Sequence, residues 1–305
     1  MPWIQIKLQT TGKQSSHVED LLMGLGSVSV TLEDSKDQPL LEPPPGATPI
    51  WDDTTVTGLF EADVDTDLIC AALRSDLGSE LPIKVEALED KDWIREWMDS
   101  FEPIAFGKRL WVCPSWKTPV DAKAVNMMLD PGLAFGTGTH ETTALCLRWL
   151  DGADVQDKIV VDYGCGSGIL AIAAALLGAK TVYCVDNDPQ ALTATRDNAE
   201  RNQVCDRIAV FPPGALPQIQ ADIMLANILA GPLMSLSEHL AGLTKPQGRV
   251  VLSGILQDQA NDVSATYQQW FNMEPATVDG DWVRLTGEKS TEPRSGTKIA
   301  SRSQS

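Results

Sequence analysis

The sequence predicts two folded parts of different class: a small α+β domain of ferredoxin-like type, followed by a larger α/β domain with a doubly wound parallel sheet. The chain has 305 residues, which at about 100–200 residues per domain suggests two domains. The first third of the chain has the predicted order β-α-β-β-α-β, whereas the remainder alternates strands with helices. A hydrophobic fraction of 43% and a charged fraction of 22% are ordinary for a folded chain.

The small domain is predicted at residues 1–88. Alternation of apolar and polar residues predicts its strands, and apolar residues at helical spacing predict its helices. Prolines at positions 43–45 predict a loop, because proline cannot donate to a β-ladder. In chain order the predicted elements are a strand at 3–8, a helix at 15–24, strands at 28–32 and 54–60, a helix at 66–77 and a strand at 83–88.

Residues 89–119 are interpreted as a helical and extended connector between the two domains. A helix is predicted from about residue 90 to 101, with Trp93 and Trp97 on one face, where packing is favoured over stacking on a ligand. A short strand is predicted at 110–113 and ends at Pro114.

The larger domain is predicted at residues 120–287, followed by a polar, disordered tail at 288–305. Gly178 suits the left-handed position that closes a helix, and Pro189 suits an early helical position. Asp279-Gly280-Asp281 between two apolar runs predicts a hairpin that joins 275–278 to 282–286. The other predicted strands are 159–163, 182–185, 208–211, 223–226 and 250–252, and the predicted helices are 169–177, 189–202, 229–243 and 257–270.

The formal net charge of -18 argues against binding to a phosphate backbone, because nucleic-acid binding uses clustered Lys and Arg side chains. Residues 1–100 carry 20 acidic and 7 basic side chains, so most of the negative charge lies in the first third of the chain. An acidic domain favours a basic macromolecular partner, whose approach it steers. Solubility alone explains the same charge equally well.

Several classes of protein are disfavoured by what the sequence lacks. The longest apolar stretch, residues 169–177, is about half as long as a membrane span, and no export signal is visible, so we expect a cytoplasmic protein without a membrane anchor. The six cysteines are scattered without a C-x-x-C pair, which indicates neither a disulfide framework nor a zinc site. None of the three histidines has metal-ligand spacing, so an organic cofactor is expected and no metal.

A predicted strand runs directly into three alternating glycines, Gly164, Gly166 and Gly168, with Asp162 just before them. Glycine is needed where the backbone turns sharply and a ligand approaches closely. The third glycine comes one residue too early for a dinucleotide fingerprint, and no Gly-Lys-Ser/Thr follows as in a P-loop. This D-x-G-x-G-x-G turn resembles that of class I S-adenosylmethionine-dependent methyltransferases, which implies a seven-stranded sheet.

Asp186 follows the turn by about 20 residues, at the end of the second strand of the large domain. Open α/β sheets bind ligands at the carboxyl ends of their strands, and an acidic side chain there accepts from ribose hydroxyls. Asp188 is the alternative ribose ligand, although its place before a predicted helix favours an N-cap.

Asn227 ends the fourth strand, where the methyltransferase superfamily places a polar residue facing the methyl donor or the nucleophile. The residues that follow lack the Asn-Pro-Pro-aromatic pattern of enzymes that act on glutamine or adenine, which disfavours those substrates. Residues 130–143 form a dense Gly/Thr loop that leads into a helix, with Phe135 available to stack on a ligand or exclude water.

These segments, together with residues 93–97 and 110–116, resemble the bacterial methyltransferases that modify ribosomal large-subunit protein eleven. The resemblance covers nearly the whole chain except the proline-rich loop and the tail. It implies an N-terminal domain that recognises the ribosomal protein and a catalytic domain that trimethylates lysine side chains and the N-terminal α-amine with S-adenosylmethionine. The implied cofactor contacts are Thr143, Gly164, Asp186 and Asn227, with Gly166 added by its place in the turn.

The acceptor side of the site is less defined by the sequence. Asn227 is the candidate catalytic residue, because its side-chain carbonyl can orient an amine. His140 is a candidate proton acceptor, and the alternative is that it positions the loop by hydrogen bonds. Two other functions stay open: a small-molecule, nucleic-acid or other protein methyltransferase on the same fold, and a cofactor-binding protein without catalysis. We expect a monomer.

Overall fold

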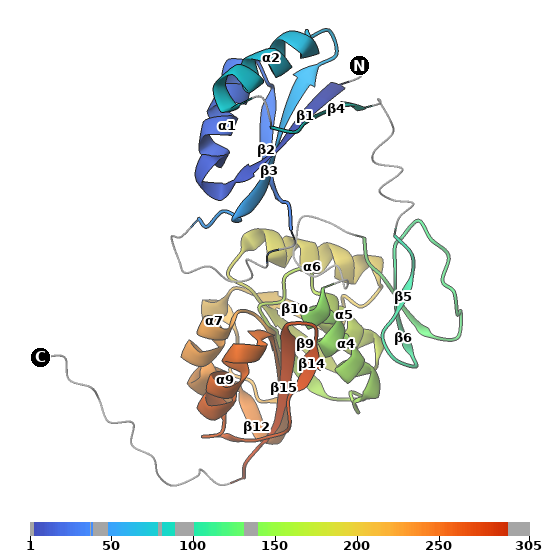
Figure 1. Ribbon diagram of the computed structural model, residues 1–305. Coiled ribbons are helices and arrows are strands. Elements are labelled where there is room, and N and C mark those ends of the chain that lie inside the picture. Colours follow the sequence, from blue (N-terminus) through green and yellow to red (C-terminus); the bar gives the residue numbers. More distant parts are fainter. Residues whose placement is uncertain are drawn as a thin grey trace, which may run out of the picture. The chain divides into compact units, whose positions relative to one another are not determined.

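The structure is a computed structural model that describes residues 3–36, 38, 48–78, 81–88, 101–130 and 140–291. The chain forms two compact units, Met1–Ser100 and Phe101–Ser305 (Figure 1). Four predicted features lie outside the described residues: the loop at prolines 43–45, the helix with Trp93 and Trp97, most of the Gly/Thr loop, and most of the polar tail.

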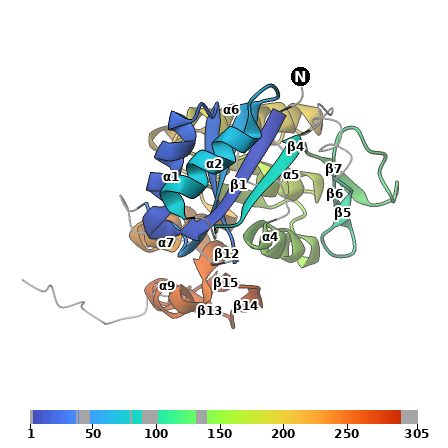
Figure 2. The same cartoon turned by 45° about the horizontal axis from the view of Figure 1, so that its top comes forward.

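The first unit has the predicted order β-α-β-β-α-β, and its four strands form an antiparallel sheet in the order β2-β3-β1-β4. Ile6 and Leu8 of β1 are two residues apart and therefore share one face, against which Val18 of α1 and Leu73 of α2 are buried. Figure 2 shows both helices on this face. The elements are β1 (Trp3–Thr11), α1 (Gly12–Gly24), β2 (Ser29–Asp34), β3 (Asp53–Glu61), α2 (Thr66–Leu77) and β4 (Ile83–Leu88).

The second unit contains a large mixed sheet in the order β10-β9-β8-β11-β12-β15-β13, with β14 paired to β15. The first five strands of this order are parallel and β15 is antiparallel. Its elements up to β10 are β5 (Ile104–Ala105), β6 (Leu110–Cys113), β7 (Val125–Met128), α4 (Glu141–Gly152), β8 (Ile159–Tyr163), α5 (Ile169–Leu176), β9 (Thr181–Val185), α6 (Pro189–Arg201) and β10 (Ile208–Phe211). The later elements are β11 (Ala221–Asn227), α7 (Ala230–Ser235), α8 (Ser237–Leu243), β12 (Thr244–Leu256), α9 (Ala260–Tyr267), β13 (Phe271–Met273), β14 (Thr277–Asp279) and β15 (Trp282–Lys289).

Helices cover both faces of the large sheet, as the prediction of a doubly wound fold requires. Val160 and Val161 of β8 are adjacent and point to opposite faces. Val160 belongs to the core that contains α4, α5 and α6, whereas Val161 belongs to the core that contains α7, α8 and α9. The strands are therefore buried on both sides, which is why they read as continuous apolar runs.

Helix α5 is buried almost throughout, and five of its eight residues have no exposed surface. Its sequence, Ile-Leu-Ala-Ile-Ala-Ala-Ala-Leu, combines high helix propensity with small side chains that allow close packing on the sheet. Gly178 follows the helix with a φ of 108°, which confirms the predicted glycine closure. Pro189 is confirmed in the first turn of α6.

Residues 101–119, which the sequence analysis assigns to the connector, lie within the second unit. Strands β5, β6 and β7 form a three-stranded sheet, and Leu110 and Val112 of β6 are part of the α4–α5 core. The carboxylate of Asp151 accepts hydrogen bonds from the backbone N–H groups of Lys108, Arg109 and Leu110, at 2.8, 2.8 and 2.9 Å. A contact between residues more than 40 positions apart fixes this turn, and local patterning cannot reveal it.

Other predicted elements differ in their limits. The helix predicted at 229–243 is two helices, α7 and α8, that break at Leu236. The hairpin is confirmed, but Gly280-Asp281 forms its two-residue loop, with a φ of 57° at Gly280. The short strands β5, β7 and β13 were not predicted. Five cysteines are buried and Cys205 is exposed. Among the described residues, no helix is long and apolar enough to cross a membrane.

Candidate active site

The predicted site residues gather at the carboxyl ends of β8, β9 and β11. The chain runs outward from β8 through β9 to β10, and then continues with β11 on the other side of β8. This reversal of direction between β8 and β11 is the place where open α/β sheets bind ligands, because the loops on either side separate there.

The glycine turn between β8 and α5 requires glycine at each of its three positions. Gly164, Gly166 and Gly168 have φ values of 80°, 54° and 80°, in the left-handed region that other residues rarely adopt. A Cβ atom on Gly164 would lie 2.2 Å from the Cγ2 atom of Ile228, so this position has no room for a side chain. The Gly164 N–H donates to the carbonyl of Val185 at 2.7 Å, which attaches the turn to β9.

Asp162 holds the turn against the helix that follows it. Its carboxylate Oδ2 accepts from the Ala171 N–H at 3.0 Å, whereas Oδ1 is buried without a hydrogen-bond partner among the described residues. Burial raises the pKa of Asp162 to about 7, the Ala171 N–H lowers the pKa, and the charge of Asp186 raises it. Asp162 is therefore a buried structural acid within the site, 1% exposed.

Asp186 lies at the end of β9 with its carboxylate against the glycine turn. Its Oδ2 atom accepts from the Gly166 N–H at 2.9 Å, and Oδ1 accepts from the Asp188 N–H at 3.0 Å. Each carboxylate oxygen can accept a second hydrogen bond, so two ribose hydroxyls can still bind. The Asp188 carboxylate caps α6 by accepting from the Gln190 N–H at 2.8 Å, which confirms the interpretation of Asp188 as an N-cap.

Asn227 and Thr143 meet although 84 residues separate them. The Asn227 Nδ2 atom donates to Thr143 Oγ1 at 3.3 Å, and Thr143, in the first turn of α4, has no exposed surface. The Asn227 Oδ1 atom is buried and has no hydrogen-bond partner among the described residues. A buried carbonyl oxygen without a donor is costly, and a bound amine or ammonium group would supply one.

His140 begins helix α4, and its contacts favour the positioning alternative over the role of proton acceptor. Its Nδ1 atom accepts from the Thr142 N–H at 3.3 Å and lies 2.9 Å from Thr142 Oγ1. Its ring packs edge-on against Trp282, with centroids 5.0 Å apart. The imidazole is thus engaged as the N-cap of α4.

Ile228 connects the two groups of site residues and was not predicted from the sequence. Its side chain lies against Gly164, and its backbone carbonyl lies against Gly254 of β12, where a Cβ would be only 2.4 Å from the oxygen. Gly254 has a φ of 81°. Glycine at positions 164 and 254 could have suggested close backbone approach, but only the fold shows that both approach Ile228.

A surface pocket of about 620 Å³ lies elsewhere in the second unit. Its lining includes Lys158 and Asp222, near the amino ends of β8 and β11, and Arg249 of β12, which pairs with Ile223 near the start of β11. The pocket is therefore at the opposite edge of the sheet from the predicted site. Among the described residues, no group of three or more His, Cys, Asp or Glu side chains is arranged to hold a metal ion.

The site residues fit S-adenosylmethionine. A partly exposed carboxylate at the end of β9 suits the ribose, the glycine turn leaves room for close approach, and the carbonyl oxygen of Asn227 has no hydrogen-bond donor among the described residues. This site on a doubly wound sheet with an antiparallel β15 between β12 and β13 defines a class I S-adenosylmethionine-dependent methyltransferase.

Comparisons with known proteins assign the family within this class. Residues 2–290 match the family described as Ribosomal protein L11 methyltransferase (PrmA). The ribosomal protein L11 methyltransferase of Tolumonas auensis is 55% identical over 290 residues, which are 95% of this chain and 99% of the relative. That of Shewanella amazonensis is 53% identical over 294 residues, 95% of this chain and 100% of the relative.

A solved structure agrees with this assignment. The crystal structure of ribosomal protein L11 methylase from Lactobacillus delbrueckii subsp. bulgaricus is 33% identical, with a TM-score of 0.58, and the match covers 62% of this chain and all of the other. The chain belongs to the ribosomal protein L11 methyltransferase family, and it is an S-adenosylmethionine-dependent protein methyltransferase.

Proposed function

We propose that this chain is a cytoplasmic, monomeric enzyme that methylates lysine ε-amines and the N-terminal α-amine of ribosomal protein L11, carrying each amine to the trimethylated state. The observation that carries the proposal is the Oδ1 atom of Asn227, which is buried at the end of β11 beside Thr143 and has no hydrogen-bond partner in the part of the chain that the structure describes. An oxygen in that state accepts from an N–H group, which an amine substrate provides.

The cofactor side of the site is assigned to residues that the fold holds in place. Asp186 accepts from the ribose hydroxyls, and Gly164 and Gly166 allow the backbone to approach the cofactor. Thr143 orients the Asn227 amide by accepting from its Nδ2 atom, which leaves Oδ1 for the acceptor amine. When bound, S-adenosylmethionine would supply a methyl group on a sulfonium: the amine lone pair would attack the methyl carbon in line with the C–S bond, which breaks with its electron pair going to sulfur, and S-adenosylhomocysteine would leave.

The amine must be neutral to act as a nucleophile, and free lysine is almost wholly protonated at pH 7 because its pKa is near 10.4. Burial of the amine in the site lowers the pKa, since a low-dielectric environment disfavours the charged form. In the first two transfers, Asn227 Oδ1 accepts from an N–H of the neutral amine, so that the lone pair points away from the oxygen. Each methylated ammonium releases a proton to water before the next transfer. The neutral dimethylated amine carries no N–H, so the third transfer does not use this hydrogen bond. We assign no side chain as general base, because the capping contacts of His140 engage its Nδ1 atom.

Recognition of the substrate is assigned to the first unit. Residues 1–100 carry 20 acidic and 7 basic side chains. A ribosomal protein that binds RNA presents Lys and Arg, because these neutralise phosphates, and such a surface is attracted to an acidic unit. The proposal needs no binding of nucleic acid by this chain itself.

The test is transfer of a labelled methyl group from S-adenosylmethionine to purified large-subunit proteins, followed by mass spectrometry. We expect the label on lysines and on the N-terminal amine of L11, in steps of one to three methyl groups per amine. An Asn227→Ala variant is expected to bind the cofactor less tightly and to lose most of the transfer. Label found only on RNA, on a small molecule or on another protein would reject the proposed substrate and leave the fold and the class standing.

A further inference from the structure

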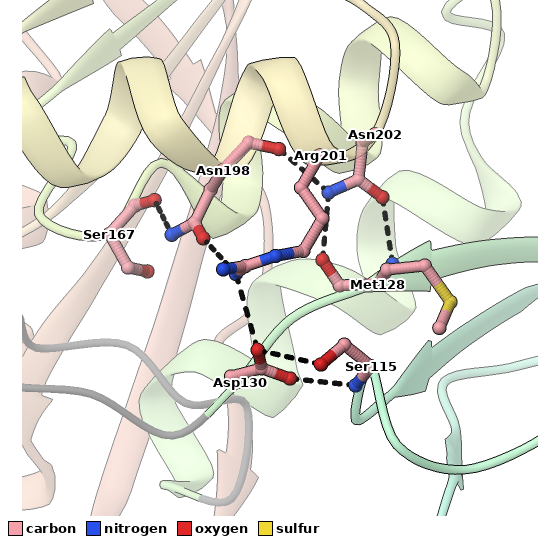
Figure 3. Close-up of polar contacts among 7 residues, drawn as sticks. All are labelled: Ser115, Met128, Asp130, Ser167, Asn198, Arg201 and Asn202. Atoms are coloured by element: carbon pink, nitrogen blue, oxygen red, sulfur yellow. Dashed lines mark hydrogen bonds and ion pairs between the residues drawn. The ribbon is translucent and has the colours of Figure 1, made fainter.

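One face of helix α6 contacts the glycine turn through two side chains. Thr195 Oγ1 donates to the Gly166 carbonyl at 3.0 Å, and Asn198 Nδ2 donates to the Ser167 carbonyl at 3.0 Å (Figure 3 shows the Asn198 contact). Residues three apart on a helix share a face, which is why both reach the same turn. Two consecutive carbonyl groups of the turn are therefore held from α6.

With Asp186, these contacts hold three consecutive peptide groups. The peptide group between residues 165 and 166 donates its N–H to Asp186. The next two peptide groups accept through the Gly166 carbonyl from Thr195 and through the Ser167 carbonyl from Asn198. Glycines are the most flexible residues, so a turn containing three of them is poorly ordered unless other groups hold it. Order of this turn before ligand binding lowers the entropic cost of binding.

Asn198 also links the turn to a second region of the unit. Its Oδ1 atom accepts from Arg201 Nη1 at 2.8 Å, and the same Nη1 lies 3.5 Å from Asp130 Oδ2 (Figure 3). Asp130 in turn accepts from the Ser115 N–H at 2.6 Å and from the Ser115 Oγ at 2.8 Å. Because the amide can donate only through Nδ2 and accept only through Oδ1, contacts on both sides fix its orientation.

Helix α6 is attached to β7 independently of Asn198. Asn202 Oδ1 accepts from the Met128 N–H at 2.7 Å, and Asn202 Nδ2 donates to the Met128 carbonyl at 2.8 Å (Figure 3). Ala191, Leu192 and Ala199 add buried apolar contacts along the helix. Replacement of Asn198 therefore removes the contact with the turn and leaves the attachment of the helix in place.

We propose that Asn198 is a positioning residue of the cofactor site, which orders the glycine turn through the Ser167 carbonyl and is itself oriented by Arg201 and Asp130. The residue touches no substrate atom and acts through the turn. This inference rests on the proposed function only in that the turn binds S-adenosylmethionine.

The deciding variant is Asn198→Asp, because aspartate has nearly the same shape, keeps the acceptor for Arg201 and cannot donate to the Ser167 carbonyl. Asn198→Ala removes both contacts. The matched control is Glu200→Gln, an exposed position on the same helix. We expect the dissociation constant of S-adenosylhomocysteine, measured by calorimetry on the full chain, to rise roughly three- to tenfold in both Asn198 variants and to stay unchanged in the control.

Two further readouts separate positioning from general stability. The Gly168 N–H, which donates to the Cys165 carbonyl at 2.8 Å inside the turn, is expected to exchange its hydrogen faster in the ligand-free Asn198 variants than in the control. The KM for L11 is expected to stay constant while the KM for S-adenosylmethionine rises. If Asn198→Ala does not fold, Asn198→Asp decides.

Unchanged affinity and unchanged Gly168 exchange in Asn198→Asp would overturn the inference and make Asn198 a helix-surface residue only. A lower melting temperature with unchanged affinity would overturn it as well. Failure of the proposed function is a different result: the wild-type chain would then not methylate L11, while the exchange of the Gly168 amide would still show whether Asn198 orders the turn.

Discussion

Asp186 and Asp188 have the same side chain, but their surroundings assign them different tasks. Asp186 faces the glycine turn, and Asp188 caps α6. We expect Asp186→Ala to raise the dissociation constant of S-adenosylmethionine about a hundredfold or more, because two hydrogen bonds to a charged acceptor are lost, each worth about 1.5–3 kcal/mol. Calorimetric titration of the purified variant measures this change.

Asp188→Ala is the matched control for that substitution. Loss of the N-cap is expected to lower the free energy of unfolding by about 1 kcal/mol, with cofactor affinity nearly unchanged. Chemical denaturation and the same titration check both quantities. If Asp188→Ala weakened the cofactor more than Asp186→Ala, the two assignments would have to be exchanged.

The buried carboxyl of Asp162 predicts a pH dependence of stability. Burial raises its pKa in the folded chain to about 7, above the value near 3.9 expected when the chain is unfolded. The stabilising contribution of the protonated form is therefore complete below about pH 4 and is lost as the pH rises through 7. The loss is at most about 1.4 kcal/mol per pH unit.

The Asp162→Asn variant removes this titration. We expect the difference in unfolding free energy between wild type and variant to change steadily between pH 4 and 7, in the direction that disfavours the wild type at the higher pH. Denaturation at several pH values measures the difference and cancels the titration of other groups. Parallel profiles across this range would show that Asp162 is ionised in the folded chain.

At the scale of elements, the turn between β5 and β6 depends on one carboxylate from helix α4, that of Asp151. Burial acts to raise the pKa of Asp151, but the N–H groups of Lys108, Arg109 and Leu110 outweigh it, so the pKa of Asp151 lies below its ordinary value. We expect Asp151→Asn to lower the free energy of unfolding by about 2–3 kcal/mol at neutral pH, because bonds to a charged acceptor are weakened.

The sign of the pH effect at Asp151 is opposite to that at Asp162. A lowered pKa in the folded chain means that the stabilisation is present above about pH 4 and is lost as the pH falls through the folded value. The difference in the free energy of unfolding between wild type and Asp151→Asn should therefore become smaller only at acidic pH. Asp154→Asn, with 79% of its side chain exposed, is the control and should stay within about 0.5 kcal/mol of wild type.

Elements with a strong local pattern could be predicted from the sequence, and those held by distant partners could not. Helix α2 and the strands β4, β6, β8 and β10 begin and end where the apolar periodicity predicts. Strand β7 has no such pattern, and its parallel pairing with β6 and its contact with Asn202 come from the fold. The residues of β6 were assigned to the connector because nothing in their own sequence indicates the hydrogen bonds between Asp151 and the turn before this strand.

The same distinction applies to the candidate site. Gly164, Gly166 and Asp186 could be found because a glycine turn and a strand end lie within one short stretch. Thr143 and Asn227 came only from the resemblance to a family, since the hydrogen bond between them joins two distant elements. The contacts of Asn198 with the turn have no sequence signature, because asparagine on a helix surface is ordinary.

At the scale of the whole molecule, charge and catalysis are divided between two units. Residues 1–100 hold most of the net negative charge, and the site residues all lie in Phe101–Ser305. We expect removal of residues 1–88 to leave the affinity for S-adenosylmethionine nearly unchanged and to abolish methylation of L11. Titration and a methyl-transfer assay on the truncated chain test both parts.

Ionic strength provides the control on the intact chain. Added salt screens the attraction between an acidic unit and a basic protein, so the KM for L11 should rise with salt while cofactor affinity changes little. A truncated chain that methylates L11 at the full-length rate would show that the second unit recognises its own substrate.

The single exposed cysteine makes the molecule accessible to spectroscopy. Cys205 lies just after α6, and the other five thiols are buried, so a maleimide dye attaches to the native chain at one defined position. Leu68 in α2 is 67% exposed, and a Leu68→Cys substitution adds a second attachment point on the other unit. Energy transfer between dyes at these two positions would then report the separation of the two units in real time, with and without L11.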